Sequence, residues 1–123
     1  MLGVDIVEIS RINKLVSDPA FINRVYTPLE IAYCTSTKNK SIIASRYAAR
    51  FAAKEAVFKA IDKLEVLSWK DIQIENEANG KPKVTFSGKA KEIVDADKLG
   101  VEISLSHSRN YAVAAAVIKY TNC

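Results

Sequence analysis

The pattern of apolar and polar positions divides the first third of the chain into one strand and several short helices. Residues 2–9 are mainly apolar at both odd and even positions, which indicates a strand with little polar surface on either face. Helix-capping signals then predict three short helices. Their caps and bounds are Ser10 for residues 11–16, Ser17–Asp18–Pro19 for a helix ending at Val25, and a Thr27/Glu30 capping box for a helix ending near Thr35.

The longest predicted helix begins near Ser41, which can cap it, and continues to about Leu64 without a glycine or proline. Alanines and aromatic residues occupy nearly every side of its helical wheel, so we expect it to be largely buried. It nevertheless carries Lys54, Glu55 and Lys59, and charges set among alanines are costly unless something pairs with them. That cost is the first indication of a functional site.

Beyond residue 64, the alternation of apolar and polar residues predicts mainly strands. The predicted strands are residues 71–77, 82–86, 101–106 and 111–120, with a hairpin turn at Asn79–Gly80 and a second turn at residues 107–110. Between them, Ser87 is expected to cap a helix over residues 88–98, which Gly100 ends. This order of elements predicts an α+β fold with a mainly antiparallel sheet packed on the long central helix.

The composition is that of a folded globular protein. The chain has 123 residues, of which 49% are hydrophobic and 26% charged, so we expect one domain over residues 1–123 with a loose tail at 121–123. No apolar run approaches the roughly 18–20 residues that a membrane span needs, and no secretory signal is visible. Cys34 and Cys123 stand in unlike contexts, which favours free thiols in a reducing compartment. We therefore expect a cytoplasmic protein with no membrane partner.

The chain is moderately basic, with a net charge of +4 and a pI near 9.1. This charge suggests an anionic partner, and it leaves nucleic acid, a phosphate-bearing cofactor and an acidic protein open. Arg11, Lys14 and Arg24 can form a basic patch on the first two short helices, although a solvated charged face is the more common arrangement.

A candidate site combines carboxylates from the first strand and the central helix. If these elements pack together, Asp5 and Glu55 can hold one divalent cation, and Mg²⁺ prefers such hard oxygen ligands with room left for water and phosphate. Lys59, one turn beyond Glu55, would add a positive charge for phosphate, and His107 could contact phosphate or carry a proton. Structural alternatives stay open for each: a hydrogen-bonded Asp5, a simple Glu55–Lys59 helix pair and a structural His107.

Several signatures of other kinds of site are absent. The chain contains no GxxxxGK[ST], GxGxxG, HExxH or GxSxG motif, and its single histidine excludes a multi-histidine zinc site within one chain. Taken on the residues alone, the candidate site indicates magnesium-assisted phosphoryl chemistry.

Three stretches of the sequence resemble the motifs of one enzyme family. They are Gly3–Ile9, Arg50–Ala56 followed by Lys59–Ala60, and Ser104–His107 followed by Tyr111–Ala112. Together with the Asn79–Pro82 turn, their order and separations are similar to those of the holo-acyl carrier protein synthases, the short homotrimeric class of 4'-phosphopantetheinyl transferases. The resemblance covers essentially the whole chain and implies the fold of that family.

The resemblance also implies a defined reaction. Enzymes of this family move the 4'-phosphopantetheine arm of coenzyme A onto a serine hydroxyl of an acyl carrier protein and release adenosine 3',5'-bisphosphate. By motif position, the implied roles are Mg²⁺ ligands for Asp5 and Glu55, coenzyme A contacts for Arg50, Lys59, Ser106 and His107, and catalytic residues for Glu55, Lys59 and His107. Some base must accept the serine proton, and a metal-bound water activated by Glu55 is the first candidate, because Mg²⁺ usually retains waters.

Partners follow from the same resemblance. Arg11 matches a basic position that faces the acidic recognition helix of the carrier protein, and Lys14 and Arg24 are its neighbours by charge and placement. The family is homotrimeric, and a subunit interface would bury the apolar first and last strands, with coenzyme A between subunits. Fatty acid biosynthesis is the expected pathway, although a polyketide carrier protein stays open. No nucleic-acid partner is expected.

The chain departs from the family pattern after Ile61, where Asp62–Leu67 replaces an expected glycine-rich segment. Glycines there would let backbone amides approach phosphate closely. Two alternatives therefore stay open beside the enzyme. One is a basic nucleotide- or RNA-binding module without catalysis, which would bind RNA in a strongly salt-dependent way and without Mg²⁺. The other is the family fold without the activity.

Overall fold

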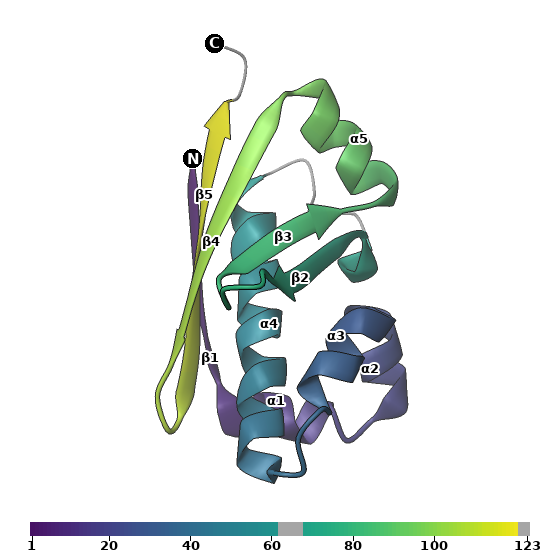
Figure 1. The fold of residues 1–123 in the computed structure, drawn as a ribbon, viewed down its shortest axis with the longest axis vertical. Helices are drawn as coiled ribbons and strands as arrows, with labels where there is room; N and C mark the ends of the chain where they lie inside the picture. Colours follow the sequence, from purple (N-terminus) through teal and green to yellow (C-terminus); the bar gives the residue numbers. More distant parts are fainter. Residues whose placement is uncertain (62–67, 121–123) are drawn as a thin grey trace.

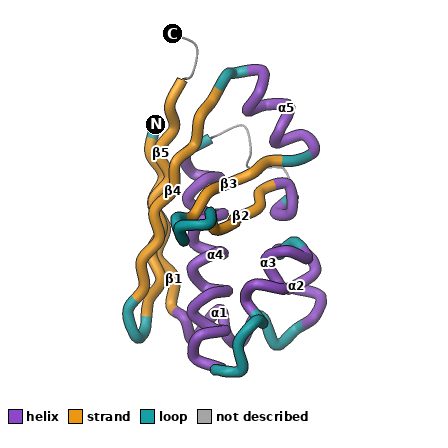
Figure 2. Tube along the Cα trace, viewed as in Figure 1, coloured by secondary structure: helices purple, strands orange, loops and turns teal. Residues whose placement is uncertain are grey.

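One long helix, α4, stands at the centre of the fold, with a three-stranded sheet on one side and shorter helices on the other (Figure 1). The computed structural model describes residues 1–61 and 68–120. The elements in order are β1 (Leu2–Glu8), α1 (Ile9–Leu15), α2 (Pro19–Val25), α3 (Pro28–Cys34), α4 (Lys40–Ala60), a 3₁₀ helix (Trp69–Asp71), β2 (Ile72–Asn76), β3 (Pro82–Phe86), α5 (Gly88–Ala96), β4 (Leu99–His107) and β5 (Tyr111–Tyr120). This arrangement, drawn by element type in Figure 2, confirms the predicted α+β fold.

The larger sheet is antiparallel and has the order β1-β5-β4, so the last strand of the chain lies in its middle. Small residues of β5, among them Ala114 and Ala116, are almost fully buried and let α4 pack closely on the sheet. Gly3 of β1 brings the backbones closer still, because a Cβ there would clash with the carbonyl oxygen of Ala56. This contact between β1 and α4 sets the distance between Asp5 and the helix.

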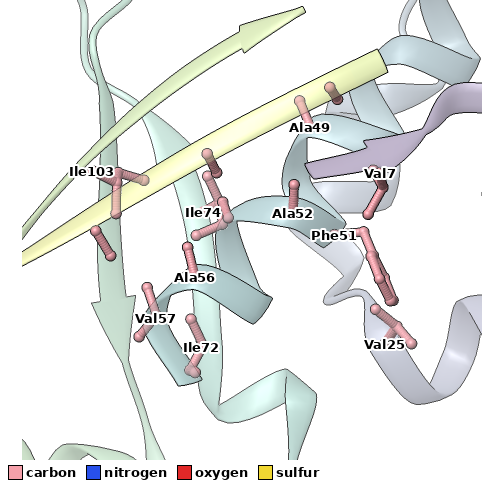
Figure 3. Close-up of a cluster of buried hydrophobic side chains, with 14 of the residues drawn as sticks. Val7, Val25, Ala49, Phe51, Ala52, Ala56, Val57, Ile72, Ile74 and Ile103 are labelled. Atoms are coloured by element: carbon pink, nitrogen blue, oxygen red, sulfur yellow. The ribbon is translucent and has the colours of Figure 1, made fainter. Parts of the chain in front are cut away.

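The β2–β3 hairpin forms a separate two-stranded antiparallel sheet, as the turn signal predicts. At its turn Gly80 has a φ of 87°, a left-handed conformation that glycine adopts without strain. Ile72 and Ile74 of β2 are buried and belong to the same core as Val57 of α4 and Ile103 of β4 (Figure 3). The hairpin is therefore attached to α4 through its apolar face.

The predicted caps of α2 and α3 are confirmed. Asp18 Oδ1 accepts a hydrogen bond from the Ala20 N–H at 2.9 Å at the start of α2. At the start of α3, Thr27 Oγ1 accepts from the Glu30 N–H at 3.3 Å, and Glu30 Oε1 accepts from the Thr27 N–H at 2.8 Å. This capping box holds the Glu30 carboxylate inside the protein, where the residue is 1% exposed.

The predicted starts of α1 and α4 are wrong. A tertiary contact sets the first, and a different capping residue sets the second. Helix α1 begins at Ile9, before the predicted cap Ser10, since the chain turns directly out of β1 and the Ile9 N–H donates to the Asn110 carbonyl at 2.9 Å. Helix α4 begins one residue before Ser41, because the side chain of Asn39 is its cap and accepts from the Ser41 N–H at 3.0 Å.

The end of α4 also differs from the prediction. The helix ends at Ala60 rather than near Leu64, because Ile61 has an extended backbone and buries its side chain at 2% exposure. The glycine-poor segment at residues 62–67 and the tail at residues 121–123 lie outside the described residues.

The end of α5 is a further correction. The helix ends at Ala96, and Gly100 is a residue of β4 rather than the helix terminator. Lys98, with a φ of 53°, makes the left-handed turn instead, so that Leu99 can begin β4 by pairing with Tyr120. Ser87 does occupy the N-cap position of α5, but its side chain makes no capping hydrogen bond with the described residues.

Two further features concern the thiol of Cys34 and the length of the helices. Cys34, the last residue of α3, is a buried free thiol, and burial raises its pKa to about 12. Among the residues that the structure describes, no helix is both long enough and apolar enough to cross a membrane.

Candidate active site

Asp5, Glu55 and Lys59 lie together where β1 packs against α4, and we call them the acidic half-site. Asp5 alternates in step with Gly3 along β1, so its side chain is on the face that meets α4. Lys59 follows Glu55 by one helical turn. Its ammonium group donates to Asp5 Oδ1 at 2.9 Å and to the Val4 carbonyl oxygen at 3.2 Å. The structure thus brings Asp5 together with two residues that follow it by about fifty positions in the sequence.

The charges of the acidic half-site are not balanced. Burial raises the pKa of Glu55 and the Asp5 carboxylate raises it further, while Lys59 and Arg11 lower it. The hydrogen bond to Asp5 raises the pKa of Lys59. Asp5 Oδ2 is buried and has no hydrogen-bond partner anywhere in residues 1–61 or 68–120. Because an unpartnered buried carboxylate oxygen is costly, the acidic half-site has the capacity to receive a further cation.

This donor set fits a hard divalent cation such as Mg²⁺. Two carboxylates, Asp5 and Glu55, lie near one lysine, and within the described part of the chain the buried Asp5 Oδ2 accepts no hydrogen bond. In the described part of the chain, no group of three or more His, Cys, Asp or Glu side chains is placed to hold a metal. The remaining coordination positions would therefore come from water and substrate, an arrangement that Mg²⁺ favours because it keeps several waters.

The predicted residues Arg50, Ser106 and His107 line a different site, a cavity of about 230 Å³. Arg50 is only 4% exposed; its guanidinium lies 4.0 Å from the centre of the Tyr33 ring, and its Nη2 donates to Asn76 Oδ1 at 3.4 Å. Its Nε is buried and has no partner within the described residues. Guanidinium groups present several donors to phosphate, so this cavity suits an anionic ligand.

The two sites lie on opposite sides of α4. At 3.6 residues per turn, Glu55 and Lys59 point about 140° and 180° away from Arg50 around the helix. We call the cavity lined by Arg50, Ser106 and His107 the basic half-site. The structure therefore does not bring all the predicted site residues into one place; a single chain presents two half-sites with the helix between them.

Comparison with known proteins identifies the family. A family model for the 4'-phosphopantetheinyl transferase superfamily matches residues 1–116. The holo-[acyl-carrier-protein] synthase of Ruminiclostridium cellulolyticum is 46% identical over 125 residues, which cover 96% of this chain and 90% of that protein. The chain belongs to the holo-[acyl-carrier-protein] synthase family.

Solved structures agree with this family. The holo-[acyl-carrier-protein] synthase of Helicobacter pylori in complex with coenzyme A has a TM-score of 0.79 and is 35% identical, covering 97% of this chain and 100% of its own. The synthase of Bacillus anthracis in complex with CoA (3',5'-ADP) has a TM-score of 0.78 and is 32% identical, with 98% and 96% covered. The resemblance read from three motifs is confirmed, and the chain is a phosphopantetheinyl transferase. Its relatives favour an enzyme over the RNA-binding alternative.

The basic residues expected to meet a carrier protein are all exposed in this member of the synthase family. Arg11 lies on α1 close enough to Glu55 to lower the pKa of that carboxyl group. Lys14 is in the last turn of α1, and Arg24 is in the last turn of α2 with its guanidinium 5.7 Å from the centre of the Phe21 ring. Arg11 is thus the one placed beside the acidic half-site.

Sequence reasoning missed several residues of the basic half-site, among them Arg46, Tyr33 and Asn76. Arg46 lines the same cavity as Arg50; its guanidinium lies 4.4 Å from the centre of the Tyr33 ring, and its Nη1 donates to the Tyr33 carbonyl at 2.9 Å. The signal was present, because Arg46 and Arg50 are four residues apart and share one face of α4. Tyr33 belongs to α3, and no motif or spacing in the sequence indicates that it lines this cavity.

Proposed function

We propose that this protein transfers the 4'-phosphopantetheine group of coenzyme A to a serine hydroxyl of an apo-acyl carrier protein, in a Mg²⁺-dependent reaction that releases adenosine 3',5'-bisphosphate. The observation that carries the proposal is the acidic half-site, in which Asp5 Oδ2 is buried beside Glu55 and has no hydrogen-bond partner among the residues that the structure describes. Related synthases solved in complex with coenzyme A support the choice of donor.

Asp5 and Glu55 are the residues that would hold Mg²⁺. When bound there, the ion would supply positive charge to a diphosphate and offset the charge that develops on the leaving group. The Lys59 side chain, 53% exposed and anchored at Asp5, is placed to contact a phosphate oxygen at the rim of the acidic half-site. These residues position the diphosphate, and the reaction then depends on aligning the serine hydroxyl with it.

The transfer balances without any further reactant. The serine oxygen forms a bond to the phosphorus that carries pantetheine, and the bond from that phosphorus to the bridging oxygen of the diphosphate breaks. Adenosine 3',5'-bisphosphate leaves with the bridging oxygen. We assign the serine proton to a water activated by Glu55. Arg50, Ser106 and His107 bind the nucleotide end of coenzyme A in the basic half-site, where the donors suit phosphate.

We propose that the enzyme is a homotrimer in which coenzyme A lies between subunits. The outer face of the larger sheet supports this, since Leu2, Val4 and Ile6 are 63%, 51% and 62% exposed on β1 and pair with residues of β5. Such a contiguous apolar surface marks an interface between proteins. The two half-sites on opposite sides of α4 support it too, because a neighbouring copy can bring its basic half-site to the acidic half-site.

The carrier protein would dock beside the acidic half-site. Arg11 is exposed on α1 near Glu55, and Lys14 and Arg24 extend positive charge along α1 and α2. An acidic helix is the partner that such a basic surface would recognise. We place this single-domain protein, residues 1–123, in the cytoplasm, where a buried free thiol such as Cys34 stays reduced.

One assay tests the proposal. Purified protein is incubated with coenzyme A, Mg²⁺ and an apo-acyl carrier protein, and the carrier protein is analysed by mass spectrometry. The expected result is a mass increase of one phosphopantetheine group, which disappears when a chelator removes the metal. Binding of coenzyme A without transfer to any of several carrier proteins would leave the family fold without the activity. Strongly salt-dependent RNA binding without a Mg²⁺ requirement would instead indicate the nucleic-acid module.

A further inference from the structure

The β2–β3 hairpin supplies one wall of the basic half-site. Asn76, Gly80 and Pro82 line the cavity together with Arg50, and Asn76 Oδ1 accepts the hydrogen bond from Arg50 Nη2. Among the described strands, β2 and β3 pair only with each other. A two-stranded hairpin is marginally stable alone, so the position of this wall depends on whatever holds β2 in place.

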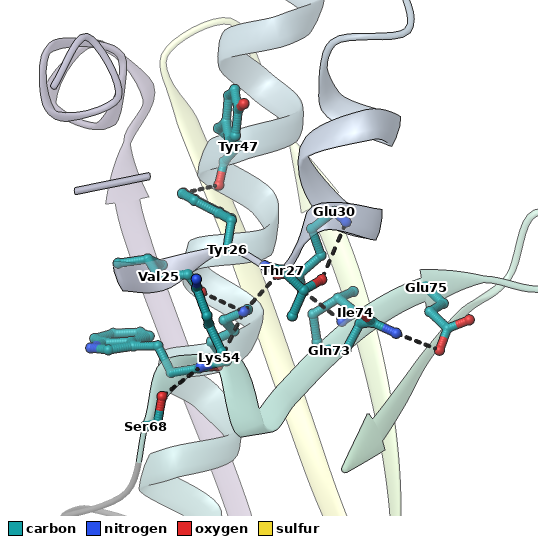
Figure 4. A network of polar contacts seen from close by, with 12 residues as sticks. Val25, Tyr26, Thr27, Glu30, Tyr47, Lys54, Ser68, Gln73, Ile74 and Glu75 are labelled. Atoms are coloured by element: carbon teal, nitrogen blue, oxygen red, sulfur yellow. Dashed lines mark hydrogen bonds and ion pairs between the residues drawn. The ribbon is translucent and has the colours of Figure 1, made fainter. Parts of the chain in front are cut away.

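Glu30 holds the free edge of β2. Strand β2 pairs with β3 along one edge, and on the other the Ile74 N–H donates to Glu30 Oε2 at 2.7 Å (Figure 4). The second carboxylate oxygen of Glu30 accepts from the Thr27 N–H at 2.8 Å and lies 2.7 Å from Lys54 Nζ. Both side chains of the Glu30–Lys54 pair are 0% exposed. The two oxygens of Glu30 therefore join α3, α4 and β2 away from solvent.

Lys54, the ion-pair partner of Glu30, lies on the same face of α4 as Arg50. The two residues are four positions apart, so they lie one turn from each other on the helix. The Lys54 ammonium group donates its three hydrogens to three oxygens: Glu30 Oε1, the Val25 carbonyl at 2.6 Å and the Trp69 carbonyl at 3.1 Å. It is fully satisfied inside the protein, and none of these contacts belongs to either half-site.

The positions along β2 connect this pair to the ligand cavity. Ile74 and Asn76 are two residues apart, so their side chains share one face of the strand and their Cα atoms are separated by about 7 Å. Fixing the Ile74 N–H therefore fixes where Asn76 meets Arg50. Lys54 and Arg50 stand on adjacent turns of α4. Strand β2 is linked to the first through the bond from Ile74 to Glu30, and to the second through the bond between Asn76 and Arg50.

We propose that Glu30 is a positioning residue for coenzyme A: its carboxylate holds β2 against α4, so that Asn76 and the hairpin turn close the basic half-site over Arg50. Glu30 itself does not line that cavity. The proposal rests on the proposed function for the identity of the ligand, although the placement of the hairpin can be measured without any ligand.

The test compares two variants that both remove the ion pair. Lys54→Met is the matched control, because it discards the charge partner but keeps both backbone N–H bonds of Glu30. The double variant Glu30→Gln/Lys54→Met also removes the charged acceptor, and a glutamine offers one carbonyl oxygen to two backbone N–H groups. The double variant avoids leaving Lys54 as a buried unpaired charge, which protects its folding.

Two measurements are made on each variant at 25 °C. Steady-state kinetics give KM for coenzyme A and KM for the carrier protein, and we expect KM for coenzyme A to rise about tenfold in the double variant, as for loss of one hydrogen bond to a charged acceptor. KM for the carrier protein is expected to stay within about twofold, because Arg11 belongs to α1, which lies away from the β2–β3 hairpin of the same chain (Figure 1). Amide hydrogen exchange by NMR measures the protection of Ile74 relative to buried amides of α4 in the same sample, so that a change in overall stability cancels. We expect this relative protection to fall in the double variant and not in Lys54→Met.

The outcomes separate the possible failures. If both variants keep wild-type KM for coenzyme A, or if Ile74 stays protected in the double variant, Glu30 has no positioning role. If KM rises equally for both substrates, the effect is general destabilisation and the proposal is overturned. If the wild type transfers no phosphopantetheine, the proposed function fails, while the exchange at Ile74 still decides whether Glu30 holds the hairpin.

Discussion

Two lysines of α4 form ion pairs of similar length but of opposite character. Lys54 Nζ lies 2.7 Å from Glu30, and Lys59 Nζ lies 2.9 Å from Asp5. The Lys54 pair is 0% exposed on both side chains, whereas the Lys59 side chain is 53% exposed and that of Asp5 14%. Lys54 and Lys59 are only five positions apart on one helix, yet one forms its ion pair inside the core and the other at its edge.

The difference lies in what each carboxylate has left to bind. Both oxygens of Glu30 accept hydrogen bonds and Lys54 uses all three donors, so neither oxygen and no ammonium hydrogen of that network is left without a partner. Asp5 keeps one buried oxygen that is unpartnered across the described ranges, with a second carboxylate, Glu55, beside it. A completed network stabilises a fold, and an incomplete one can take up a ligand. The comparison separates a structural charge from a functional one on the same helix.

The largest effect on stability is expected for the buried Lys54–Glu30 pair. Lys54→Met should lower the free energy of unfolding by about 3–5 kcal/mol, because it leaves the Glu30 carboxylate as an uncompensated buried charge. Urea unfolding followed by circular dichroism measures the change, with an unchanged m-value showing that the folded state is still compact. A loss below about 1 kcal/mol would put Lys54 in the same class as an exposed pair and remove the contrast.

On the functional side, Glu55→Gln should lower kcat/KM by at least about a hundredfold, a loss of roughly 2.7 kcal/mol in transition-state stabilisation. The neutral amide cannot serve as an anionic metal ligand, although it has nearly the same shape. Unfolding of the same sample is the control and should change little. The opposite pattern, an unstable variant whose folded fraction is fully active, would make Glu55 a structural residue.

Contacts between residues that are close in the sequence could be predicted from it, and contacts between distant residues could not. The Thr27/Glu30 capping box depends on a spacing of three residues, and it was predicted and is confirmed. The contact of Glu30 with Ile74 spans 44 residues, and no propensity or motif refers to it. The cost of charges among alanines indicated that Lys54 needs a partner, but only the packing of α3 on α4 shows which one.

The candidate site shows the same limit. The motifs identify Asp5, Glu55 and Lys59, and the close packing at Gly3 brings them together. Arg50 was expected in the same site because it stands in the same motif. The angle of about 140° between Arg50 and Glu55 follows from helix geometry, but its consequence depends on β4 and the hairpin lying on the far side of α4. Similarly, Asn39 replaced Ser41 as the cap because both are good capping residues and their positions differ by only two.

A smaller effect tests the electrostatics of the acidic half-site through pH. Because the pKa of Glu55 is raised in the folded protein, its charge opposes folding near neutral pH. As pH falls through the raised pKa, the folded protein takes up the proton first, so the penalty disappears. Glu55→Gln should therefore be slightly more stable than the wild type at pH 7 in metal-free buffer, and equally stable at acid pH. Urea midpoints across pH 4–8 measure this; a constant difference would show that Glu55 is not strained by burial and Asp5.

The smallest effect is expected for the exposed member of the comparison. Its raised pKa means that Lys59 contributes stability below the ordinary lysine pKa and loses that contribution as pH rises through the folded value. Since the side chain is 53% exposed, solvent and salt screen the interaction, and Lys59→Met should change the free energy of unfolding at pH 7 by less than about 1 kcal/mol. Measuring it beside Lys54→Met in low and high salt completes the contrast, because only the Lys59 effect should fade with salt. A salt-independent loss of several kcal/mol at Lys59 would mean that the pair with Asp5 stabilises the fold, and the acidic half-site would then have no spare capacity to explain.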